Sequence, residues 1–177
     1  METVAKRYAQ SLFSLALDQQ AVLDYQKDMN LVNKIFFENP NFIRFFNEVS
    51  VSNEDKYQII DQGFKGQIDT YIVNFLKLLI KKRRIKHILE INQEFKELAN
   101  EYLGIEEGTL YTSFTLDSKQ IKEVEAAISK KEQKTVKLTV INDPSLIGGI
   151  KVVIKNRVYD GSIKNKVSLL KKELLRK

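Results

Sequence analysis

The single histidine is the first residue whose chemistry could support catalysis or metal binding. His87 has Glu90 and Glu94 at helical spacing, and a carboxylate can orient an imidazole as a general base. However, the chain contains no cysteine, no second histidine and no serine motif that would supply a nucleophile. We therefore expect no catalytic residue, no metal site and no cofactor, and we predict that the protein is not an enzyme.

The glycine pair Gly148-Gly149 could suggest a phosphate-binding loop. Nucleotide fingerprints place their glycines between a strand and a helix, whereas this pair leads into IKVVIK, a segment typical of a strand. The pattern instead predicts a turn or bulge that needs unrestricted backbone angles or lets another strand approach closely. We assign Asp143, which begins the segment DPSLIGG, to the same structural turn motif.

Asp160, Gly161 and Ser162 form a second turn, which precedes a helical pattern. A helix N-terminus can bind an anion, but Asp160 would repel one. We expect a strand-to-helix corner in which Gly161 supplies unusual backbone angles and Ser162 caps the helix. Both turns are therefore interpreted as structural.

The basic excess is confined to the C-terminal segment. Residues 1–105 contain 14 Lys or Arg and 14 Asp or Glu, whereas residues 151–177 contain nine basic and two acidic residues. The run Lys81-Lys82-Arg83-Arg84 follows an apolar helical pattern, and cations at such a helix end interact favourably with its dipole. Since residues 1–105 have no net charge, we favour a solvated helix end there over a nucleic-acid site.

Hydrophobic periodicity divides the chain into two parts. Up to residue 103 apolar residues recur three and four positions apart, which predicts helices over 3–18, 20–38, 42–46, a segment after Ser52, 69–83 and 85–103. From Gly104 onwards the pattern predicts strands near 110–116, 135–141, 149–155 and 157–159, with helices after Asp117 and Ser162. The expected fold class is α+β: an all-α six-helix bundle over residues 1–105, then a small α/β domain over residues 106–177.

Two of the predicted helices carry more apolar surface than one core contact requires. In the first helix, Tyr8, Leu12 and Leu15 widen the apolar arc, and the helix over 69–83 is apolar nearly all round. Such a helix either lies at the centre of the bundle or presents a second face to a partner. A groove between two helices is a recurrent receptor for an amphipathic helix.

Residues 143–162, DPSLIGGIKVVIKNRVYDGS, together with AKRYAQSLFSLA at residues 5–16, resemble the delta subunit of F-type ATP synthases, the oligomycin-sensitivity-conferring protein family. The resemblance covers nearly the whole chain. In that family a six-helix bundle receives the N-terminal helix of an alpha subunit between its first and fifth helices. Carried over by position, this implies a partner-binding groove lined by Tyr8, Ser11, Leu12, Asn74 and Leu78.

The resemblance also implies that the C-terminal domain meets the C-terminal ends of the peripheral-stalk b subunits. One copy per complex would act as a stator, which holds the catalytic head against the torque of the rotor so that proton flow drives ATP synthesis. It further implies a peripheral location on the cytoplasmic face of a bacterial cell membrane, with membrane contact only through the complex and no nucleic-acid partner.

The alternative class is a basic RNA- or ribosome-associated protein, whose lysine-rich C-terminal helix would follow phosphates. Phosphate binding weakens steeply with salt, whereas capture of a helix in an apolar groove depends on salt weakly. A salt titration therefore separates the two readings.

Overall fold

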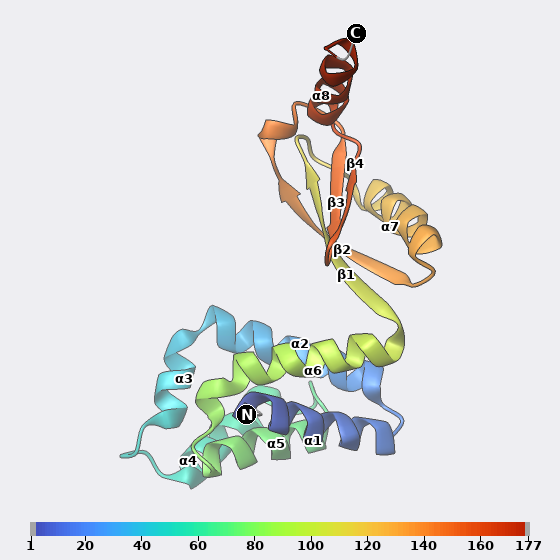
Figure 1. The fold of residues 1–177 in the computed structure, drawn as a ribbon. Coiled ribbons are helices and arrows are strands. Elements are labelled where there is room, and N and C mark those ends of the chain that lie inside the picture. Colours follow the sequence, from blue (N-terminus) through green and yellow to red (C-terminus); the bar gives the residue numbers. More distant parts are fainter. Residues whose placement is uncertain (1–2, 176–177) are drawn as a thin grey trace. The chain divides into compact units, whose positions relative to one another are not determined.

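The computed structural model describes residues 3–175, which divide into two compact units between Leu103 and Gly104. We call residues 1–103 the helical unit and residues 104–177 the α/β unit, and describe each by itself (Figure 1). The division lies two residues before the boundary expected from the sequence. Gly104 has a φ of +64°, which turns the chain directly from a helix into a strand.

The helical unit contains six α-helices and one 3₁₀ turn among its described residues. They are α1 (Val4–Asp18), α2 (Val22–Glu38), α3 (Pro40–Asn47), α4 (Asn53–Phe64), α5 (Thr70–Lys81), η1 (Ile85–His87) and α6 (Ile88–Leu103). Three of these helices have a side-chain cap at the N-terminus, because the side chains of Thr3, Ser52 and Asp69 each accept a hydrogen bond from an amide of the first turn. α6 packs against both α1 and α2, and its buried side chains include Ile91 and Phe95.

The α/β unit is a four-stranded mixed sheet with helices. Its elements are β1 (Ile105–Thr112), α7 (Ser118–Glu132), β2 (Thr135–Asn142), η2 (Pro144–Leu146), β3 (Ile150–Ile154), β4 (Arg157–Asp160) and α8 (Ile163–Leu174). The strand order is β2-β1-β3-β4, with β1 parallel to β2 and antiparallel to β3, and with β4 antiparallel to β3. A small core lies between α7 and one face of the sheet (Figure 1), formed by Leu110, Val136, Val152 and Ile154 with Val124 and Ile128 of α7.

This architecture confirms the predicted α+β fold class, with corrections at element ends. The first strand was expected near 110–116 but covers Ile105–Thr112. It ends there because the Thr112 hydroxyl bonds both the backbone nitrogen and the backbone oxygen of Phe114, which forms a local turn. The second helix begins at Val22 and not at residue 20, because Gln20 has a φ of +54°.

The expected helix over 85–103 is also modified at its start, where Ile85–His87 forms a 3₁₀ turn before α6. None of the helices described in residues 3–175 is long and apolar enough to cross a bilayer.

Candidate partner-binding site

His87 lies in η1 and forms one side-chain pair, between its Nδ1 and Glu90 Oε2 at 3.0 Å. Nothing in this pair provides a nucleophile, and residues 3–175 contain no group of three His, Asp or Glu side chains that could hold a metal ion. We therefore interpret the pair as a local contact at the start of α6.

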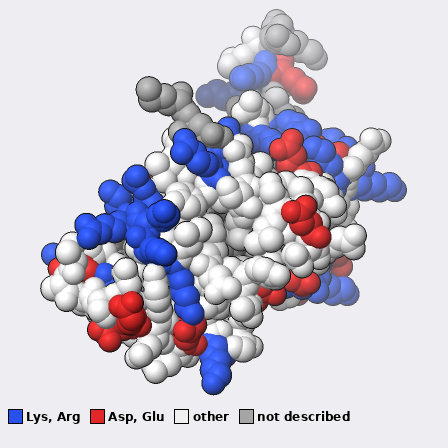
Figure 2. Space-filling view, turned by 90° about the horizontal axis from the view of Figure 1, so that it is seen from below, with Lys and Arg blue, Asp and Glu red and all other residues white. Residues whose placement is uncertain are grey.

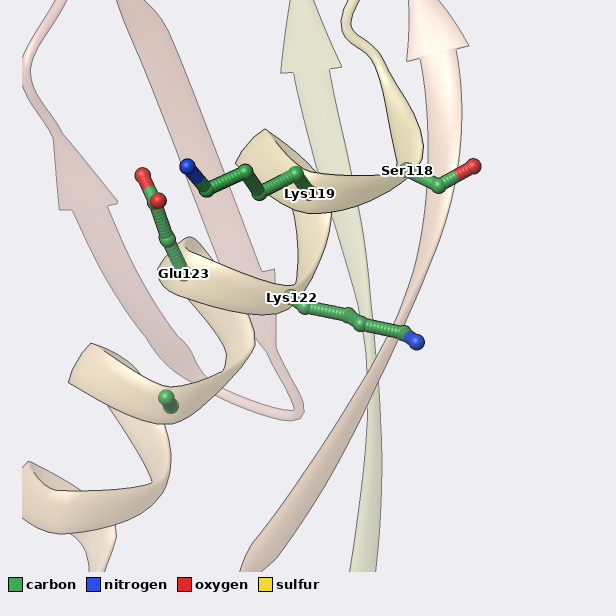
Figure 3. Close-up of a pocket in the computed structure, with 5 residues that line it drawn as sticks. Ser118, Lys119, Lys122 and Glu123 are labelled. Atoms are coloured by element: carbon green, nitrogen blue, oxygen red, sulfur yellow. The ribbon is translucent and has the colours of Figure 1, made fainter.

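A surface pocket lies on the first turns of α7, lined by Ser118, Lys119, Lys122, Glu123 and Ala126. In Figure 3 the side chains of Lys119 and Glu123 extend to one side of the helix, whereas Lys122 extends to the other. The polar groups do not converge on a common point, as they would in a small-molecule site. The α7 pocket is therefore not a candidate small-molecule site.

We call the surface formed by α1 and α5 the α1–α5 face, and four of the five expected groove residues are at least partly exposed on these two helices. Tyr8 of α1 is half-buried, and its ring lies edge-on to Phe75 of α5 with centroids 6.2 Å apart. Ser11 is exposed, and its hydroxyl donates to the Arg7 carbonyl at 2.9 Å. On α5, Asn74 and Leu78 are exposed. Aromatic contact thus holds α1 next to α5, with small, polar and apolar side chains left open beside it.

Leu12 does not share that exposure. Its side chain is 2% exposed and belongs to the core of the helical unit. It therefore supports α1 from below the surface and offers no open contact area.

Tyr71 was not assigned to the groove from the sequence, but it is exposed on the same side of α5 as Asn74 and Leu78. It is 47% exposed and Leu78 is 42% exposed, and positions 71, 74 and 78 lie on one side of a helix. The i, i+3, i+7 spacing of these positions is the sequence pattern that could have identified Tyr71. In a view from the side where α1, α4 and α5 lie, much of the middle of the surface is uncharged, and a group of Lys and Arg lies to its left (Figure 2).

The apolar side chains of α5 lie on two faces of the helix, one buried and one exposed. Ile72, Phe75, Leu76, Leu79 and Ile80 are buried in the core, whereas Tyr71 and Leu78 remain exposed. Central packing therefore explains one face of α5, and a partner on the exposed face remains a prediction. The basic run after it, Lys81 to Arg84, is exposed.

The two turn motifs of the α/β unit pack against each other. The Gly161 amide donates to the Ile150 carbonyl at 2.9 Å and the Ile163 amide donates to the Gly148 carbonyl at 3.0 Å. Gly149 has a φ of +78°, and a Cβ on it would lie 2.5 Å from the Gly161 carbonyl oxygen. The predicted turn with close backbone approach is thus confirmed for Gly149.

The role expected for Gly161 was wrong. Its φ is outside the left-handed region, in which Gly66, Gly104 and Gly149 are the glycines found among the described residues. Ser162 does cap α8, because its Oγ accepts from the Asn165 amide at 3.1 Å. Unusual backbone angles at this corner belong to the other motif, at Gly149 and at Ile147 with a φ of +66°.

The two motif aspartates close their own turns. Asp160 accepts from the Ser162 amide at 2.9 Å, and Asp143 accepts from the Ser145 amide at 3.0 Å. Hydrogen bonds from these serines lower the pKa of both carboxyls below the ordinary range. Both side chains are therefore committed to the turns as ionised acceptors.

No pattern in the sequence indicated the ionic network that forms around two buried carboxylates in the α/β unit. Glu106 is 4% exposed, and it accepts hydrogen bonds from Lys134 at 2.8 Å and from Arg157 at 2.6 Å. Arg157 also pairs with Glu132, whose side chain is buried and accepts from the Tyr159 hydroxyl. The hydrogen bond from Lys134 is the main reason that the pKa of Glu106 lies below its ordinary value. Its members are up to 51 residues apart in the chain, so only the fold brings them together.

The fold and the α1–α5 face define a two-unit α+β protein whose candidate site is a protein-binding surface. The family model of the ATP synthase delta (OSCP) subunit matches residues 4–174. The chain therefore belongs to the ATP synthase delta (OSCP) subunit family.

Relatives named ATP synthase subunit delta agree over nearly the whole length. One from Lysinibacillus sphaericus is 34% identical, covering 97% of each chain, and one from Metamycoplasma arthritidis is 35% identical, covering 94% of this chain and 93% of the relative. Among solved structures, a chain of the Toxoplasma gondii mitochondrial ATP synthase hexamer matches with a TM-score of 0.68 at 21% identity, covering 98% of both chains. That likeness supports the fold.

Proposed function

We propose that this protein is a non-catalytic connector of an ATP synthase, in which the helical unit binds the N-terminal helix of an alpha subunit on the α1–α5 face. The observation that carries the proposal is the exposed row of Tyr71, Asn74 and Leu78 on α5 beside Tyr8 and Ser11 of α1. Tyr71, Tyr8 and Leu78 would provide apolar anchor area, and Asn74 could pair with a polar group of the incoming helix. The α/β unit would meet the ends of the peripheral-stalk b subunits.

In this role the protein acts as a stator. Simultaneous binding at both ends would hold the catalytic head stationary, so that rotor torque is used for ATP synthesis. The combined affinity of two moderate contacts exceeds that of either one. Its location would follow from the complex, at the cytoplasmic face of a bacterial membrane.

Leu78→Asp tests the head-binding face. We expect a loss of about 2–3 kcal/mol in binding of a fluorescently labelled peptide from the alpha-subunit N-terminal helix of the same organism, because the new charge would be buried without a partner. The fold should persist, since Leu78 is 42% exposed in the free protein. Leu23→Asp on α2 is a matched control, because Leu23 is 46% exposed and lies outside the proposed face.

The titration is run at low and high salt. Tight binding that changes little with salt, lost in the Leu78 variant and kept in the Leu23 variant, supports the connector. Equal binding by both variants would contradict the assignment of the α1–α5 face. Absence of peptide binding together with salt-sensitive RNA binding would favour the basic RNA-associated alternative.

A further inference from the structure

α8 leaves a row of apolar side chains uncovered. Ile163, Val167, Leu170 and Leu174 are 47%, 57%, 58% and 77% exposed, and no side chain of α8 is buried. In the described part of the chain, α8 makes its main contact with η2, near its own N-terminal end (Figure 1). A helix with this much open apolar surface commonly marks a binding site.

The spacing of the row is that of a coiled-coil seam. The intervals between Ile163, Val167, Leu170 and Leu174 are four, three and four residues, which places them at successive d, a, d and a positions of a heptad. Leu169 and Leu175 are also exposed but lie on other sides of the helix. We call the four residues the α8 seam.

The positions that flank the seam are mostly basic. Lys164, Lys166 and Lys171 occupy three of the four e and g positions, and Glu173 occupies the fourth. In a parallel pair of two copies Lys166 would face Lys171, whereas in an antiparallel pair Lys164 would face Lys171 but Lys166 would face Glu173. Like charges thus disfavour parallel self-association, and an acidic partner would be attracted by all three lysines.

We propose that the α8 seam is a half of a heterotypic coiled coil, which takes a helix with apolar a and d positions and Asp or Glu at the flanking e and g positions. This inference rests on the proposed connector function in that the stalk end would supply the acidic helix. The apolar seam provides the affinity, whereas the lysines select the partner and set its register.

The test uses the full chain and a designed, labelled heptad peptide with Ile and Leu at a and d and Glu at e and g. The peptide is about three heptads long, because shorter helices are marginal in water. Its control has Lys at every e and g position. We expect the Glu peptide to bind and the Lys peptide to bind at least about tenfold more weakly.

Leu170→Asp should weaken binding of the Glu peptide by at least about tenfold. Leu169→Asp is the matched control, since it makes the same change at the neighbouring, off-seam leucine, and should change binding by less than about twofold. Because both leucines are more than half exposed, both variants should fold, which circular dichroism verifies. Lys164→Glu with Lys171→Glu should reverse the preference towards the Lys peptide.

The same variants are then titrated with the C-terminal segment of the b subunit from the same organism. If this segment binds wild type and both leucine variants equally, the α8 seam assignment is overturned while the connector function stands. If the segment does not bind wild type, the connector function fails at this end. Binding of the Glu peptide still tests whether the α8 seam takes an acidic helix. Dimerisation through α8, or binding to phosphatidylglycerol vesicles without binding of the Glu peptide, would also overturn the proposal.

Discussion

At the scale of single residues, the position of Gly149 requires both a positive φ and the absence of a Cβ, and only glycine meets both requirements. Its φ of +78° is rarely adopted by other residues, and the Gly161 carbonyl occupies the space where a Cβ would lie. Gly148 meets a softer neighbour, because a Cβ there would lie 2.6 Å from Cδ1 of Ile163, the end of a flexible side chain. The two glycines should therefore differ in their tolerance of substitution.

We expect Gly149→Ala to destabilise the α/β unit by about 2–3 kcal/mol, since backbone strain and a backbone clash add. Gly148→Ala should cost less, because Ile163 can move. Chemical denaturation followed by NMR signals of the α/β unit measures both changes. Equal effects of the two substitutions would show that the close approach at Gly149 does not determine the stability of this turn.

At the scale of elements, α8 depends strongly on its first turn. It buries no side chain, so tertiary packing contributes little to its stability. Its N-cap, Ser162, is buried and accepts from the Asn165 amide, and Asn165 in turn donates to the Asp160 carbonyl at 3.1 Å. These bonds connect the start of the helix to the end of β4.

Ser162→Ala should therefore lower the helical content of residues 163–174, with a cost of about 1 kcal/mol for the lost cap. Carbon chemical shifts of α8 measure the population of helix. Ser168→Ala is the control, because Ser168 is exposed in the same helix and caps nothing. Retention of full helicity in the Ser162 variant would indicate that other contacts hold α8.

At the scale of the whole molecule, the two units should respond differently to acid. The lowered pKa of Glu106, whose ordinary value is 4.5, means that the folded state favours its ionised form. Its stabilising contribution is therefore full above pH 4.5 and is lost as the pH falls through the lowered folded pKa. Asp143 and Asp160, also in the α/β unit, shift in the same direction.

In the helical unit, some carboxyl pKa values are raised and others are lowered. Burial raises the pKa of Asp28, which favours the protonated folded state on acidification, while hydrogen bonds to the backbone of Ser50 and Val49 lower the pKa of Glu48. We expect the α/β unit to lose its NMR signals first as the pH is lowered from 7 to 3. Glu106→Gln should flatten the acid dependence of that unit. If the NMR signals of both units disappear at the same pH, and the Glu106→Gln variant behaves like the wild type, the role of Glu106 is contradicted.

Much of the architecture followed from local sequence signals. Three local signals predicted the order and type of nearly all elements. They are the three-and-four spacing before residue 103, the helix-start residues Ser52, Asp69, Asp117 and Ser162, and the change of period at Gly104. These signals act within a few residues, so they are readable without the fold. Errors fell at element ends, as at Thr112 and Gln20, where a side-chain hydrogen bond or a positive φ decided the boundary.

The tertiary structure alone decided which apolar and charged residues are covered. The family resemblance placed both Leu12 and Leu78 in the groove, yet packing buries Leu12 at 2% exposure and leaves Leu78 at 42%. Glu106, Glu132 and Arg157 form one network only because the mixed sheet brings β1, α7 and β4 together. Burial and long-range pairing depend on what neighbouring elements cover, and that information is not contained in any local stretch of sequence.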